Sequence, residues 1–235
     1  MAESENPAPI FAAEPTDESK QLDEWWFNYL DRVRESVTAA EQYLEIPTGT
    51  ISSIAQEPDF IAVVKAYAVI EPMLNDLISA RSPRPALGIL SAALAIPASP
   101  DEGFQSFVSG LNIGGRIGKV ALAKSLGLLR DDQVRFVEGV ARVRNRYAHN
   151  VRNMHRSFAD ILLEEQKGNA KIVGQVTGVQ IKLPNPTLAP TLKLFMYHRL
   201  ADYLSNALDT LKPPPLPMGS LFGLGAIPDQ PDEPS

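Results

Sequence analysis

The residues best suited to chemistry lie in the segment RFVEGVARVRNRYAHNVRNMHR, residues 135–156. This segment contains six arginines and one glutamate, and hence carries a formal charge of +5 in a chain whose net charge is −6. Two explanations for this concentration of charge are open. The segment is either a solvated helix face balanced by acidic neighbours in space, or a surface that binds phosphate groups.

Arg144 has an unusual place in this segment. On a helical wheel it falls in the middle of an apolar face formed by valines, Phe136 and Tyr147. The opposite, polar side of the wheel holds three further arginines: Arg135, Arg142 and Arg146. A guanidinium among apolar side chains loses water and cannot neutralise itself, so it needs a partner. That partner is a carboxylate of the bundle such as Glu71 or Asp76, a subunit interface, or an anionic ligand.

His149 follows Arg144 by five residues, about 140° around a helix, so the two side chains diverge if the helix is unbroken. They converge if the helix ends near His149, or if two copies of the chain face each other. Asn150 suits a helix end because asparagine tolerates the left-handed conformation. We therefore expect the helix to end at this point.

Composition excludes several classes of site and location. The chain has no cysteine and three histidines, which excludes thiolate chemistry and argues against a metal site, so we expect no metal and no cofactor. The N-terminus has no basic and apolar signal-peptide pattern, and the longest apolar run, residues 85–97, is shorter than the roughly 20 residues that span a bilayer. We expect a soluble cytoplasmic protein without membrane contact.

Apolar periodicity, caps and prolines predict an all-α helical bundle. The helices that we expect cover residues 17–45, 59–80, 83–95, 114–128, 131–148, 154–166 and 190–211. We expect one domain over residues 18–212, with its core at about 58–211, between a disordered lead (1–17) and a disordered proline-rich tail (213–235). Residues 171–183, KIVGQVTGVQIKL, alternate and are rich in β-branched residues, which favours a small β-hairpin.

The segment Arg144-Asn145-Arg146-Tyr147-Ala148-His149 resembles the signature of the HEPN superfamily, in which an Arg, a polar residue and three more residues precede a His. The segments AVVKAYAVIEPMLNDLI, GRIGKVALAKSLGLL and RNRYAHN resemble the three leading helices of a HEPN bundle. The branch of closest resemblance includes mannitol operon repressor-like proteins. The resemblance covers about residues 58–211.

Active HEPN proteins are metal-independent endoribonucleases, so the resemblance implies cleavage of single-stranded RNA by attack of its own 2′-OH. It implies that His149 acts as base or acid, that Arg144 binds the phosphate, and that Asn145 orients either of them. One histidine does not easily serve both ends of the displacement, so the resemblance also implies a homodimer with a composite site. The rim that would guide the RNA consists of Arg142, Arg146, Arg152 and Arg156.

Two functions are open at this point. The first is a ribonuclease that acts in phage defence, in a stress response or as a toxin with an antitoxin partner. In HEPN toxins paired with a nucleotidyltransferase a Tyr follows the His by two positions, and because Val151 stands there, neutralisation through that Tyr is not expected. The second is a non-catalytic regulator resembling the mannitol repressor branch, which acts on transcription through protein contacts.

Overall fold

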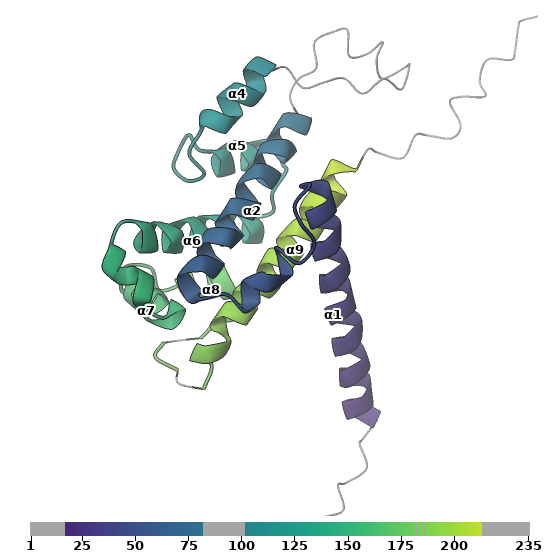
Figure 1. Cartoon of the computed structure of the whole chain (residues 1–235), viewed down its shortest axis with the longest axis vertical. Helices are drawn as coiled ribbons and strands as arrows, with labels where there is room; N and C mark the ends of the chain where they lie inside the picture. Colours follow the sequence, from purple (N-terminus) through teal and green to yellow (C-terminus); the bar gives the residue numbers. More distant parts are fainter. Residues whose placement is uncertain (1–16, 82–101, 182, 186, 213–235) are drawn as a thin grey trace, which may run out of the picture.

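The computed structural model describes residues 17–81, 102–181, 183–185 and 187–212. Within these ranges the chain is helical and has no strand, which confirms the prediction of an all-α bundle (Figure 1). The predicted helix at 83–95 and the predicted tail at 213–235 lie outside the described residues, as does the predicted lead apart from Asp17. No helix of the described ranges is long and apolar enough to cross a membrane.

Two apolar helices, α2 (Asp59–Ala80) and α9 (Leu192–Leu211), pack together at the centre. α2 begins at Asp59, directly after Pro58, and a carboxylate in the first turn suits the helix dipole. The Asp59 carboxylate accepts a hydrogen bond from the backbone N–H of Phe158 (2.7 Å) and pairs with Lys193 (3.1 Å). One side chain therefore ties α2 to α9 and to the start of α7 (Phe158–Gly168).

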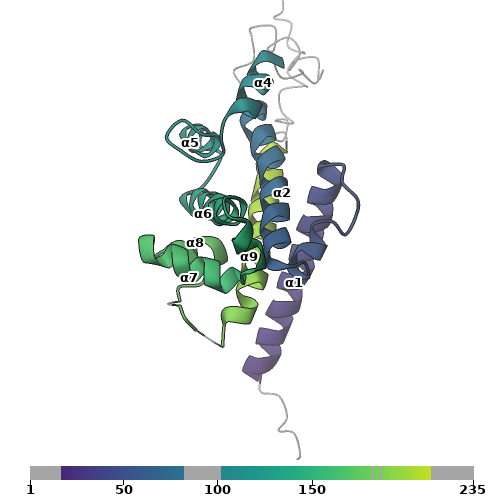
Figure 2. The same cartoon turned by 60° about the vertical axis from the view of Figure 1, so that its left-hand side comes forward.

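Helices α5 (Lys119–Ser125), α6 (Asp131–Ala148), α7 and α8 (Ile172–Thr177) lie on one side of the α2–α9 pair, and α1 (Asp17–Tyr43) lies on the other (Figures 1 and 2). α1 packs on α9, where Trp25, Trp26 and Tyr29 form an aromatic cluster with His198. The two indoles are 54% and 44% exposed, so they do not belong to the core. Burial lowers the pKa of His198, which favours its neutral form beside these rings.

α6 (Asp131–Ala148) has the bounds that the sequence predicts. Its start is marked by two acidic residues and by the Gln133 side chain, whose Oε1 accepts the backbone N–H of Arg130 at 2.9 Å. Its apolar face packs on α2, and Gly139 allows close contact with α8, because a Cβ at this glycine would lie 2.8 Å from Val176. α6 is thus fixed on two faces, and its polar face remains open.

The predicted helix at 114–128 is shorter in the structure. α5 spans Lys119–Ser125, and residues 114–118 form a turn in which Gly115 has φ +99°. A further helix that we did not predict, α4 (Glu102–Gly110), precedes this turn. The buried Lys119 ammonium pairs with Glu71 of α2 at 2.7 Å, which anchors α5 and the glycine-containing turn to the bundle.

The β-hairpin predicted at 171–183 is wrong. Residues Ile172–Thr177 form helix α8, whose β-branched side chains are buried between α6 and α9. Gly178 adopts φ +77° and its N–H donates to the carbonyl of Gly174 at 2.9 Å, so it ends a helix rather than turning a hairpin. The alternating pattern reflects burial on two sides of a short helix.

Candidate functional site

The end of α6 borders an open cleft of about 1060 Å³. All three residues of the predicted catalytic group, Arg144, Asn145 and His149, line this cleft. His149 directly follows Ala148, the last residue of α6. It keeps helical dihedrals (φ −78°, ψ −10°), and its N–H donates to the Asn145 carbonyl at 2.9 Å. Arg144 and His149 therefore border the same cleft within a single chain.

The backbone beyond His149 is held by two asparagines. Asn150 is extended (φ −144°, ψ 110°), not left-handed as we expected, and its Oδ1 accepts the backbone N–H of Arg152 at 3.0 Å. Asn153 is buried, and its Nδ2 donates to the carbonyl of Arg146 at 2.7 Å. These bonds fold the short 3₁₀ helix Val151–His155 back onto α6 and fix the position of His149.

Arg144 is half-buried, with its guanidinium carbon 4.9 Å from the ring centroid of Tyr67 on α2. Its Nη1 donates to Asn145 Oδ1 at 3.1 Å. Within the described ranges no carboxylate pairs with it. On the apolar side of α6, Arg144 thus meets the face of the Tyr67 ring, which attracts a cation without neutralising its charge.

The predicted orienting carboxylates do not reach Arg144. Glu71 pairs with Lys119, and Asp76 accepts a hydrogen bond from Tyr43. Burial raises the pKa of Asp76. Both residues therefore stabilise contacts between helices, and neither forms the ion pair with Arg144 that the sequence left open.

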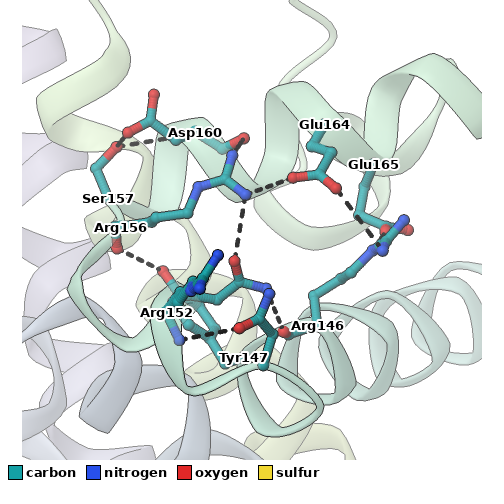
Figure 3. A network of polar contacts seen from close by, with 10 residues as sticks. Arg146, Tyr147, Arg152, Arg156, Ser157, Asp160, Glu164 and Glu165 are labelled. Atoms are coloured by element: carbon teal, nitrogen blue, oxygen red, sulfur yellow. Dashed lines mark hydrogen bonds and ion pairs between the residues drawn. The ribbon is translucent and has the colours of Figure 1, made fainter.

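Two of the predicted rim arginines are paired with carboxylates of α7 (Figure 3). Arg146 Nε forms a short ion pair with Glu165 and its Nη1 lies 3.7 Å from Glu164. Arg156 forms a short ion pair with Glu164, and its hydrogen bond lowers the pKa of that carboxyl. Glu165 is only 7% exposed, whereas Arg146 is 49% exposed, so the carboxylate of this pair is buried and its guanidinium remains in contact with water.

The other two rim arginines differ from each other. Arg142 lines the cleft, with Nη1 3.8 Å from Glu165. Arg152 is exposed on the 3₁₀ helix and is not among the residues that line the cleft. Acidic neighbours therefore balance the charges of Arg142, Arg146 and Arg156, as the first of the two explanations for the basic segment expects. No described carboxylate balances the charge of Arg144.

Tyr147 belongs to the core, as its place on the wheel predicts. It is fully buried, its ring contacts Phe60, and its hydroxyl donates to the carbonyl of Arg156 at 3.3 Å. Burial raises the pKa of this phenol, which keeps it neutral and able to donate. It links α6 to the segment that leads into α7.

Several residues of the cleft have no signal in the sequence. Tyr67 lies on a helix that is distant along the chain, and only packing of α2 against α6 brings it to Arg144. Gly114 and Gly115, which also line the cleft, fall in a segment that we expected to be helical. Glu164 and Glu165 have the pattern of ordinary solvated residues of an amphipathic helix.

Comparison of the chain with protein-family models, with curated proteins and with solved structures finds no significant match. The resemblance to the HEPN superfamily therefore stays a prediction from the residues. A function for this chain has to be argued from the geometry of the cleft.

Proposed function

We propose that this protein is a metal-independent endoribonuclease of cytoplasmic single-stranded RNA, acting in defence or in a stress response. The observation that supports the proposal is the convergence of Arg144, Asn145 and His149 on one open cleft, with the Arg144 guanidinium stacked on Tyr67 and unpaired among the described residues. A cation held in place without a counter-ion is suited to bind an anion.

The reaction uses the substrate's own nucleophile. The ribose 2′-oxygen attacks the adjacent phosphorus as its proton passes to a base, and the bond from phosphorus to the 5′-oxygen breaks as that oxygen takes a proton from an acid. The products carry a 2′,3′-cyclic phosphate and a 5′-hydroxyl. Arg144 stabilises the extra negative charge on the phosphate, and His149 transfers one of the two protons, since an imidazole can both accept and donate a proton.

The second proton transfer calls for a second histidine on the opposite side of the phosphorus. His149 is exposed, and it is followed on the 3₁₀ helix by the exposed apolar residues Val151 (71%) and Met154 (38%). A homodimer that joins the two clefts through this end of α6 supplies one imidazole as base and its partner as acid.

Cleavage of single-stranded RNA in EDTA tests the proposal. We expect the full chain to cut, and both Arg144→Ala and His149→Ala to lower the rate by about 10³-fold, the effect of losing an oxyanion donor or an acid–base group. The matched controls are Arg34→Ala, an exposed arginine on α1, and His155→Ala, an exposed histidine that does not line the cleft. Both controls retain the rate.

A substrate with one 2′-deoxy nucleotide sharpens the result, because removal of the attacking hydroxyl blocks this reaction at that linkage and no other. Cutting that persists in both cleft variants, or at the deoxy linkage, would contradict the site.

A second function, a non-catalytic regulator that acts through protein contacts, is favoured by the pairing of Arg146 and Arg156 with α7, because paired arginines are less available to RNA. This function predicts no cleavage by the wild-type chain and a partner whose binding depends on Arg144. A wild-type chain that cuts RNA with the expected dependence on His149 excludes it.

A further inference from the structure

A second hollow of about 560 Å³ adjoins the cleft on the side of α5. Gly115 and Glu138 line both, so the two hollows are direct neighbours. Among the described residues, three cations line the second hollow: Arg116 from the glycine-containing turn, Lys124 from α5 and Arg135 from α6. The carboxylates of Asp131 and Glu138 line it as well. A chain that occupies the cleft can therefore continue along α6 in this direction.

Two of the three cations are available to a ligand. Lys124 pairs with Asp131 at 2.9 Å. Arg116 and Arg135 are exposed, and neither forms an ion pair or a side-chain hydrogen bond with a described residue. Arg135 is near enough to Asp131 to help lower the pKa of that carboxyl, whose ion-pair partner is Lys124. They come from different elements and line the same hollow, an arrangement that allows two guanidinium groups to bind one phosphate.

At the opposite end of the cleft the arginines are paired with carboxylates. A third hollow lies there, lined by Arg146, Arg156, Lys167 and the carboxylates Asp160 and Glu164. Both of its arginines are already paired with α7. The electrostatic attraction on a polyanion that extends out of the cleft is therefore stronger on the side of α5, where two arginines form no ion pair with a described residue, than on the side of α7.

Glu138 lies where the cleft and the second hollow meet, and no described cation forms an ion pair with it. A phosphate is repelled from this point. A strand that spans both hollows therefore has one phosphate on each side of Glu138, and a ribose or base between them, whose hydroxyl or amino groups can donate to the carboxylate.

We propose that Arg116 and Arg135 form a second phosphate subsite, which positions the RNA strand next to the linkage held at Arg144. The identity of the ligand as RNA rests on the proposed function. The subsite directs the strand along α6 toward α5, and not across the rim of Arg146 and Arg156. It is a positioning site: it holds the strand and does not touch the reacting atoms.

Binding of a fluorescent single-stranded oligoribonucleotide to the full chain tests the subsite, with His149→Ala in every variant to prevent cleavage. We expect Arg116→Ala/Arg135→Ala to weaken binding about tenfold at low salt. We also expect it to lower the slope of log affinity against log salt by about 0.7, the value for one lost phosphate contact on a single strand. Arg32→Ala/Arg34→Ala on α1 removes the same charge and changes affinity less than about twofold.

Substrate length separates positioning from general attraction. On a dinucleotide, which has a single phosphate at the linkage to be cut, Arg116→Ala/Arg135→Ala leaves cleavage unchanged. On a longer strand it raises KM and preserves kcat. Arg116→Lys/Arg135→Lys, which keeps both charges, restores most of the affinity.

Each failure has its own signature. A chain that cuts RNA, with equal losses of affinity in the two double-alanine variants, overturns the subsite and leaves the proposed function intact. A chain that binds RNA through Arg116 and Arg135 but does not cut overturns the proposed function and leaves the subsite intact. A chain that binds no RNA overturns both.

Discussion

Three of the arginines that border the cleft at the end of α6 differ in whether a carboxylate pairs with them. Arg146 and Arg156 are bound to carboxylates of α7, and Glu165 among these is largely buried (Figure 3). Arg144, closer to Tyr67, is stacked on a ring and pairs with no carboxylate of the described ranges. Arg146 and Arg156 have the character of a structural cluster and Arg144 that of a binding residue, although all three lie in one basic segment of the sequence.

The largest expected effect comes from Arg144. Arg144→Ala removes a charge that pairs with no carboxylate in the described part of the chain, so we expect the free energy of unfolding to change by less than about 1 kcal/mol, the value of an exposed cation–π contact. Cleavage falls by about 10³-fold. Chemical denaturation and single-turnover kinetics on the same preparation measure both numbers. An Arg144→Ala variant that is much less stable and still cleaves at the wild-type rate would mean that Arg144 is structural and does not bind the phosphate.

Arg146→Ala is expected to show the opposite pattern. It leaves the buried Glu165 carboxylate with only Arg142, at 3.8 Å, as a cation, so we expect a loss of about 1–2 kcal/mol of stability. Cleavage changes by no more than a few-fold. Arg146→Lys, which keeps the charge, recovers part of the stability. An unchanged denaturation midpoint in Arg146→Ala would mean that the ion pair between Arg146 and α7 contributes nothing to the stability of the fold.

Tyr67 tests what holds Arg144 in place. Tyr67→Leu removes the ring beneath the guanidinium and lowers the cleavage rate about fivefold, in line with about 1 kcal/mol for a cation–π contact. Tyr67→Phe keeps the ring and keeps the rate. If both variants lose activity equally, the hydroxyl and not the ring is what Arg144 requires.

The smallest effect concerns pH. The pKa of Glu164 is lower in the folded chain than in the unfolded one, chiefly because of its hydrogen bond with Arg156. Its contribution to stability is therefore complete above the ordinary glutamate pKa of about 4.3 and is lost as the pH falls through the lowered value. Because Glu164 is 38% exposed, this contribution is a few tenths of a kcal/mol.

Melting curves between pH 3 and 6 check this expectation, with Glu164→Gln as the variant that lacks the titration. The wild type loses more stability on acidification than the variant. The same stability loss in both proteins would show that the carboxyl is not perturbed by its arginine.

The sequence predicts the helices best where local signals mark their ends. Pro58-Asp59 and Asp131-Asp132 mark the starts of α2 and α6, and the predicted bounds of both helices are confirmed. The hairpin prediction was wrong because β-branched residues around two glycines have the same local pattern in a strand and in a short buried helix. Only the packing of α8 between α6 and α9 distinguishes them.

The site was predictable in part. Arg144 and His149 border one cleft near the helix end that was expected at Asn150, although Asn150 itself is extended and not left-handed. The partners of the arginines were not predictable. Tyr67 and Glu165 reach α6 from other helices, and no spacing in the sequence records which guanidinium meets a carboxylate and which meets a ring.

The position of the tryptophans has a practical consequence. The chain has two tryptophans, Trp25 and Trp26, and both lie on α1, on the opposite side of the α2–α9 pair from α5, α6 and α7. Trp26 contacts His198 of α9, and Trp25 stacks on Tyr29. Intrinsic emission therefore reports on whether α1 is docked on α9, whereas circular dichroism reports on the helices as a whole. If α1 detaches before the remaining helices melt, the two optical signals give different transition midpoints for the same sample.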